Sequence, residues 1–87
     1  MRDVSPVTII RDRYDGTYSG APWLAFNLDP EDVPQEVSDE DVPCMMFWEH
    51  QRSMEILDHK HAMPIGRGNG PDEALQDLYR KVPEEDR

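Results

Sequence analysis

An amphipathic helix at residues 71–82 constrains the fold of this chain more than any other segment. Pro71 suits the first helical position, and Pro83 ends the helix. Its single apolar stripe follows helical spacing and consists of Ala74, Leu75, Leu78 and Val82. A helix with one apolar stripe must bury it against another element, so the preceding sequence has to supply an apolar surface.

Two segments near the start of the chain are typical of strands. Val7–Arg13 is rich in β-branched residues, and Pro22–Leu28 contains two aromatic residues that favour strands. The stretch between them contains the turn dipeptides Asp15-Gly16 and Ser19-Gly20. It therefore predicts a long hairpin loop over residues 14–21, with more than one turn, that joins antiparallel strands.

The middle of the chain predicts a helix and a further strand. The helix is expected from about residue 39 or 42 to residue 51, with Ser38 and Asp41 as a capping pair. A third strand is predicted at Ser53–Asp58, turning through His59-Lys60 into residues 61–66. Arg67–Gly70 is then expected to form a turn before the C-terminal helix.

These segments together predict one α+β domain over residues 1–87, with a flexible tail at 83–87. Its small antiparallel sheet, of about three strands, is packed by the C-terminal helix and by the middle helix, in a minimal two-layer core. The expected core residues are Ile9, Trp23, Phe26, Phe47, Trp48, Leu75 and Leu78. A chain this short buries only about 60–65% of its unfolded surface. Since Cys44 is the only cysteine, self-association is an expected source of extra stability.

The acidic stretch Asp29–Asp41 is the first candidate site. Seven of its thirteen residues are acidic and none is basic, in a chain whose net charge is −10. This charge disfavours nucleic acid and anionic lipid membranes as direct partners and favours a basic protein. The candidate partner-binding residues are Asp29, Glu31, Asp32, Glu36, Asp39, Glu40 and Asp41. The alternative is a solvated loop that contributes only solubility.

The hairpin loop with its flanking arginines is the second candidate site. Arg11 and Arg13 lie on one side of the predicted strand, and each offers a planar donor fork to a carboxylate or phosphate. The candidate residues for an anionic small molecule are Arg11, Arg13, Tyr14, Asp15, Tyr18, Ser19, Trp23 and Arg67. The alternative is a twisted hairpin whose arginines pair with Asp12, Asp15 or the acidic stretch.

No residue combination predicts catalysis, a metal site or a cofactor. The metal-capable residues His50, Asp58, His59 and His61 are too local for a tetrahedral site. Cys44 lies beside the acidic stretch, which disfavours a thiolate, so a buried cysteine is expected. The glycines before the C-terminal helix match neither a dinucleotide fingerprint nor a P-loop.

Three features of the sequence predict a cytoplasmic protein. The longest apolar run, Cys44–Trp48, is far shorter than the ~20 residues of a membrane-spanning helix. The first six residues lack the apolar core of a secretion signal, and a single thiol fits a reducing compartment.

One segment resembles a known family. A glycine-rich turn leads into an acidic, alanine- and leucine-containing helix in Gly66-Arg67-Gly68-Asn69-Gly70-Pro71-Asp72-Glu73-Ala74-Leu75-Gln76-Asp77-Leu78. It resembles the start of the helix in HicB-like proteins, which implies a β-β-β-α domain with a partial ribonuclease-H-like fold and the role of an antitoxin. The acidic stretch has no counterpart there. Arg11–Trp23 is similar to uncharacterised short proteins of bacteria and phages, which implies a fold and no activity.

The preferred hypothesis is a non-enzymatic inhibitor of phage or mobile-element origin. It binds a basic, nucleic-acid-processing or defence protein through its acidic surface, aided by exposed methionine and tryptophan. The first alternative is a sponge for a nucleotide-like anionic ligand, held in the hairpin loop. The second is an antitoxin-like partner of a small ribonuclease.

Overall fold

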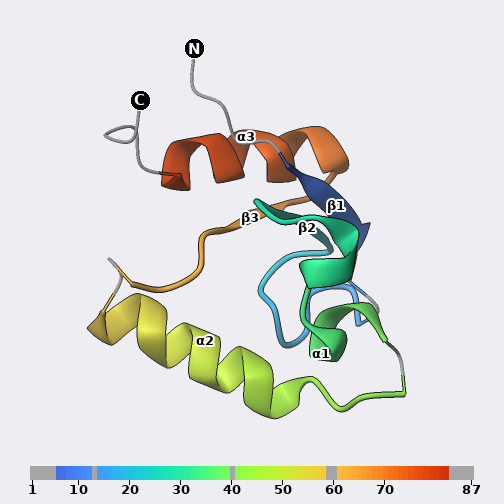
Figure 1. Ribbon diagram of the computed structural model, residues 1–87, viewed down its shortest axis with the longest axis vertical. Coiled ribbons are helices and arrows are strands. Elements are labelled where there is room, and N and C mark those ends of the chain that lie inside the picture. Colours follow the sequence, from blue (N-terminus) through green and yellow to red (C-terminus); the bar gives the residue numbers. More distant parts are fainter. Residues whose placement is uncertain (1–5, 13, 40, 59–60, 83–87) are drawn as a thin grey trace.

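The computed structural model describes residues 6–12, 14–39, 41–58 and 61–82. In chain order its elements are β1 (Thr8–Arg11), β2 (Trp23–Phe26), the 3-10 helix η1 (Pro30–Asp32), α1 (Gln35–Ser38), α2 (Met45–Leu57), β3 (Ile65–Gly68) and α3 (Pro71–Lys81) (Figure 1). The three strands form one antiparallel sheet in the order β1-β2-β3. The predicted α+β fold is therefore confirmed. The predicted tail at 83–87 lies outside the described residues.

The register of the sheet divides its side chains between two faces. Leu24 of β2 lies opposite Ile10 of β1 on one side and Arg67 of β3 on the other. The next residue, Ala25, lies opposite Ile9 and Gly66. Because successive side chains of a strand point to opposite faces, Leu24 and Arg67 share one face, and Ala25 and Gly66 share the other.

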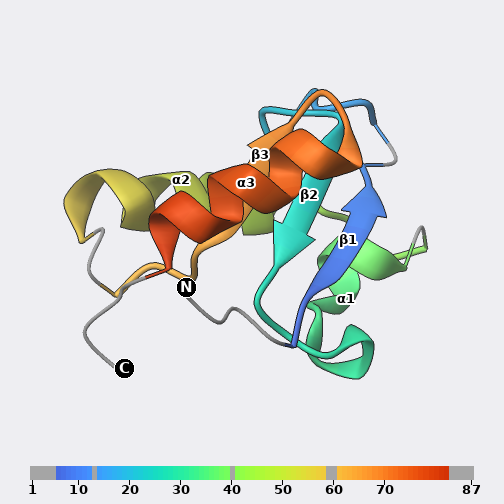
Figure 2. The ribbon, with the colours of Figure 1, turned by 90° about the horizontal axis from the view of Figure 1, so that it is seen from above.

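Helix α3 covers the face that carries Ala25 and the two glycines of β3 (Figure 2). Its buried residues in this cluster are Ala74 and Leu78, and Val82 follows at its end. A Cβ at Gly68 would lie 2.5 Å from the backbone nitrogen of Ala74, and a Cβ at Gly66 would overlap the Ala74 carbonyl oxygen. The helix can rest directly on the strand because neither position has a side chain.

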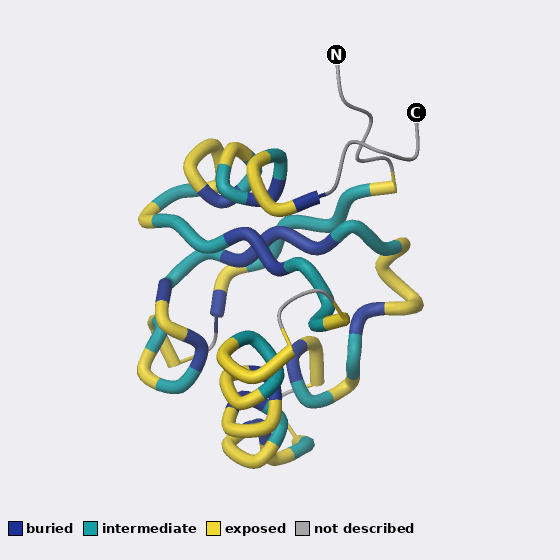
Figure 3. The backbone as a smooth tube through the Cα atoms, turned by 90° about the vertical axis from the view of Figure 1, so that its left-hand side faces the viewer, coloured by how far each residue is buried: buried dark blue, intermediate teal, exposed yellow. Residues whose placement is uncertain are grey.

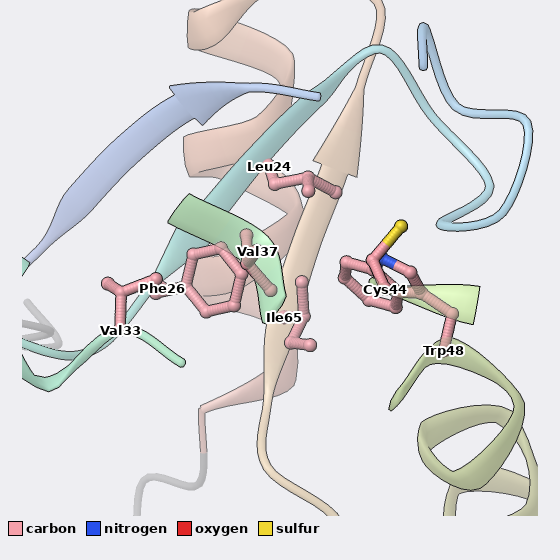
Figure 4. Close-up of a cluster of buried hydrophobic side chains, with 7 residues drawn as sticks. All are labelled: Leu24, Phe26, Val33, Val37, Cys44, Trp48 and Ile65. Atoms are coloured by element: carbon pink, nitrogen blue, oxygen red, sulfur yellow. The ribbon is translucent and has the colours of Figure 1, made fainter. Parts of the chain in front are cut away.

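The opposite face of the sheet buries a second cluster, which adds a third layer to the two-layer core that the sequence predicted. It consists of Leu24, Phe26, Val33, Val37, Cys44, Trp48 and Ile65 (Figure 4). The sheet is thus covered by α3 on one side and by the segment 29–57 on the other, which makes three layers (Figure 3). The reason is that the strands present apolar side chains on both faces.

Of the predicted core residues, Phe26, Trp48 and Leu78 are buried. The other four flank the two clusters and are partly buried: Ile9, Trp23, Phe47 and Leu75. The expectation of an exposed tryptophan is wrong, because Trp48 is 2% exposed and Trp23 is partly buried. Met45 and Met46 are exposed, as expected.

The predicted strand at Ser53–Asp58 is wrong, because residues up to Leu57 continue α2. Trp48 and Gln51 bury one side of this helix, and the Gln51 side chain donates to the Met63 carbonyl oxygen at 2.9 Å. These contacts with distant residues favour the helix over the local strand pattern.

The third strand instead forms at Ile65–Gly68, and the predicted turn at Arg67–Gly70 is therefore wrong for its first two residues. Helix α2 begins at Met45, later than predicted, and Ser38 ends α1, so it does not cap α2. The first two strands are also shorter at their ends than the sequence predicted.

Asp77 of α3 joins the helix to β3. Its carboxylate accepts hydrogen bonds from the Arg67 backbone N–H at 2.8 Å and from Arg80 at 2.6 Å, and it pairs with Lys81 at 2.7 Å. Lys81 also donates to the Ile65 carbonyl oxygen at 2.9 Å. Burial alone would raise the pKa of Asp77, but the bonds from Lys81, Arg67 and Arg80 together outweigh burial and lower the pKa below its ordinary 3.8.

The lowered pKa predicts how stability depends on pH. A carboxylate with a depressed pKa in the folded state stabilises the protein above its unfolded pKa, and this contribution is lost as pH falls through the folded pKa. Asp77→Asn should therefore be less stable than the unmodified protein at pH 7, and the difference should shrink as pH falls below about 3.8. Urea unfolding of both proteins at several pH values measures it, and a pH-independent difference would contradict the prediction.

Candidate functional site

The hairpin loop is organised by Asp12, which the sequence suggested only as an ion-pair partner for arginine. Asp12 is buried, and its carboxylate accepts the backbone N–H of Gly16 at 2.7 Å and of Tyr14 at 3.3 Å. Asp15 and Gly16 adopt positive φ angles of 54° and 91°. The Asp-Gly pair was the available signal, because aspartate and glycine tolerate this backbone conformation.

Arg11 is paired within the hairpin loop itself. Arg11 pairs with Asp15 at 2.9 Å, and both side chains are mostly exposed. The rings of Tyr14 and Tyr18 pack edge to face with centroids 5.3 Å apart. Arg13 lies outside the described residues. The twisted hairpin with an Arg–Asp pair, the alternative interpretation of the sequence, matches these contacts.

The candidate residues Ser19 and Trp23 lie in different surroundings and do not form one ligand site. Ser19 is buried, and its hydroxyl donates to the Ala21 carbonyl oxygen at 3.1 Å. Trp23 packs with the α3 cluster, on the face of the sheet opposite to Arg67. The sheet therefore separates Trp23 from Arg67, the candidate that β3 contributes.

The Arg67 side chain contacts three residues, one in the hairpin loop and two in α2. Its Nε donates to the Ser19 carbonyl oxygen at 2.6 Å, and its Nη2 lies 3.2 Å from the Glu55 carboxylate. Its guanidinium carbon lies 5.8 Å from the centroid of the Trp48 ring. These contacts join the hairpin loop, α2 and β3, so the guanidinium acts as a bridge within the fold.

The backbone amides before α3 are occupied by the protein's own carboxylates. The Asn69 N–H donates to Glu73 at 2.9 Å, and the Arg67 N–H donates to Asp77 at 2.8 Å. An external anion would have to displace both carboxylates. The glycines at 66–70 therefore serve the packing and the turn.

The acidic stretch has a different arrangement, because buried valines hold it on the core. Val33 follows η1 and Val37 lies in α1, and both are buried in the cluster with Phe26 and Ile65 (Figure 4). The solvated loop expected from the sequence is thus a pair of short helices with an apolar underside. No sequence signal beyond the two isolated valines indicated this anchoring.

Five acidic residues of the stretch are exposed. Glu36 is half-buried, and Glu40 lies outside the described residues. The exposed members are Asp29, Glu31, Asp32, Asp39 and Asp41. Within the described part of the chain, the side chains of Asp29, Glu31, Asp32 and Asp41 make no ion pair. Among the described residues, these four carboxylates therefore form an anionic surface that no described cation neutralises.

The described residues contain no group of three or more His, Cys, Asp and Glu side chains that could hold a metal ion. His61 contacts Asp58 at 2.8 Å on the surface, whereas His59 lies outside the described residues. Cys44 is buried, as predicted. None of the described helices combines the length and the apolar character needed to cross a membrane.

Comparisons of the chain with protein-family models, with curated proteins and with solved structures found no match. The resemblance to HicB-like proteins therefore stays a prediction.

Proposed function

We propose that this protein is a non-enzymatic binding protein that uses residues 29–41 to engage and inhibit a basic protein in the cytoplasm. The observation that carries the proposal is the anchoring of this stretch by Val33 and Val37, which leaves Asp29, Glu31, Asp32, Asp39 and Asp41 exposed. A surface held in one conformation loses less entropy on binding than a mobile loop would lose.

The charge of the surface supports a cationic partner. Carboxylates without partners in their own fold can pair with lysine and arginine of another protein, and the net charge of −10 accelerates the encounter. A nucleic-acid-processing protein has a groove of the required charge. The acidic surface would occlude this groove in competition with nucleic acid.

The alternative of a small-molecule sponge has less support. Its candidate residues lie on both faces of the sheet, and Arg67 already binds Ser19, Glu55 and Trp48 within the fold. Release of Arg67 for a ligand would break these contacts, so the protein-binding function is preferred.

The proposal predicts that charge position, and not only net charge, determines binding. Glu31→Lys with Asp32→Lys should lower the affinity for the basic partner about tenfold or more, since two attractive contacts become repulsive. Capture from a bacterial lysate, with mass spectrometry, identifies the partner. Titration of that purified partner at fixed salt then measures affinity.

The matched control is Asp58→Lys with Asp72→Lys. Two reversals raise the net charge from −10 by 2 × 2 to −6 in both double variants. The control should bind within about threefold of the unmodified protein, because screening limits long-range effects at physiological salt. Equal loss of affinity in both variants would mean that net charge alone drives binding, and equal retention would refute the proposed surface.

A further inference from the structure

Helix α2 carries an outer face that nothing in the described structure covers. Five large hydrophobic residues among the described residues are exposed, and four of them lie on this helix. Met46 is 80% exposed, Ile56 is 72% exposed and Leu57 is 83% exposed, with Met45 at 50%. Single exposed apolar residues are ordinary, whereas a group on one helix indicates an interface.

The spacing of these residues places them on one side of the helix. Residues 45 and 56, and likewise 46 and 57, are eleven positions apart, which is close to three helical turns and about 16 Å along the axis. Glu49 and Ser53 lie between the two apolar pairs on the same side, because 46, 49, 53 and 56 follow three-four spacing. The outer face therefore has two apolar ends and a polar centre.

The inner face fixes the orientation of α2. Trp48 and Gln51 are the buried residues of the helix. Trp48 packs in the cluster with Leu24, Phe26 and Ile65 of the sheet. Gln51 donates to Glu55 of the same helix at 2.7 Å and to the Met63 carbonyl oxygen at 2.9 Å. In Figure 3 the turns of α2 are exposed on the side away from the sheet. Its apolar ends are thus directed away from the rest of the fold.

We propose that two copies of this chain associate through α2 in antiparallel orientation. About a two-fold axis near the middle of the helix, Met46 meets Ile56 of the second copy, and Met45 meets Leu57. Both apolar ends are covered in this arrangement. Contacts of this reciprocal kind are what a two-fold symmetric interface requires.

The polar centre selects the antiparallel orientation. There Glu49 lies opposite Ser53 of the second copy, whose hydroxyl can donate to the carboxylate. In a parallel pair Glu49 would lie opposite Glu49, and two like charges at this distance repel. The outer face of α2 is therefore complementary to itself only when the two helices are antiparallel.

Charge also favours this face as the place where two copies meet. The exposed Glu49 and Arg52 on α2 offset each other, although the whole chain carries −10. The contact is limited to a helix of 13 residues, about 20 Å long, so the buried area falls below the ~1,200 Å² of a stable interface. A reversible dimer with a dissociation constant on the order of 10–100 µM is expected.

Sedimentation equilibrium over about 5 µM to 1 mM tests the proposal. The unmodified protein should shift from monomer to dimer, whereas Met46→Lys and Ile56→Glu should each remain monomeric. Met46→Lys lowers the net negative charge, so its monomeric state would not result from added repulsion. Tyr14→Glu, which has the same charge change as Ile56→Glu at an exposed site outside α2, should dimerise normally.

A mixture of the two variants makes the test specific for register. Met46→Lys mixed with Ile56→Glu restores one native Met46–Ile56 contact and creates one Lys–Glu pair, so the mixture should form a heterodimer. Far-UV circular dichroism confirms that each variant is folded. A monomeric unmodified protein at 1 mM, dimerisation of both single variants, or a mixture that remains monomeric would each overturn the proposal.

Discussion

Replacement of Gly66 by valine will lower the free energy of unfolding by about 3 kcal/mol or more. A Cβ at this position overlaps the carbonyl oxygen of Ala74 and lies 2.7 Å from the backbone nitrogen of Leu78. Both obstacles are backbone atoms of α3, so no side-chain rotation relieves the clash. The helix has to move away from β3, which opens the cluster around Ala25. Stability of a domain this size is on the order of 5–10 kcal/mol, so the loss is large.

Gly70→Ser is the matched control for the substitution at Gly66. Gly70 is the residue that caps α3, its φ is −154°, and a Cβ added to it would have no heavy atom within 4 Å. Serine is a good capping residue, so stability should stay the same or rise by about 0.5 kcal/mol. Urea denaturation of both variants measures the effect. A Gly66→Val protein within about 1 kcal/mol of the unmodified protein would show that α3 does not rest on β3 as described.

Trp48→Ala will lower the free energy of unfolding by about 3–5 kcal/mol. Trp48 is 2% exposed, packs edge to face on Phe47 at 4.9 Å between ring centroids, and lies beneath the Arg67 guanidinium. It is the main apolar side chain that attaches α2 to the sheet. Its loss leaves a cavity and removes the ring from Arg67, so α2 should lose protection in hydrogen exchange before α3 does.

Trp48→Phe separates the packing of this residue from its polar atom. The indole N–H is buried and has no hydrogen-bond partner within the described residues. Phenylalanine keeps most of the apolar volume and removes an unsatisfied donor, which costs about 1–3 kcal/mol when buried. Trp48→Phe should therefore cost less than half of what Trp48→Ala costs. Equal losses in the two variants would indicate that the indole N–H makes an essential interaction.

The acidic stretch illustrates the limits of composition as a guide. The charge and the prolines of residues 29–41 predicted a solvated segment, and its carboxylates are indeed largely exposed. No local feature of the sequence explains why Val33 and Val37 should be buried. Their burial depends on Phe26 and Ile65, which the sheet brings within reach. These contacts with distant residues hold the acidic stretch on the core in one conformation.

The hairpin loop was likewise predictable only in part from the sequence. Asp15-Gly16 and Ser19-Gly20 predicted the turns, because these dipeptides have strong backbone preferences. The candidate ligand residues around them depended on which side chains meet in space. Arg67 is 48 residues away from Ser19 in the chain, and sequence spacing carries no information about their contact.

Local patterns were enough to predict the C-terminal helix, the first two strands, the hairpin between them and the α+β class. Each of these depends on residues close together in the chain: apolar periodicity, proline and glycine positions, and turn dipeptides. Three other features became visible only in the folded molecule: residues 53–57 are helical, the third strand contains Gly66 and Gly68, and both faces of the sheet are covered. These features depend on long-range packing, because a glycine that resembles a turn signal in the sequence can instead be the place where a helix rests on a strand.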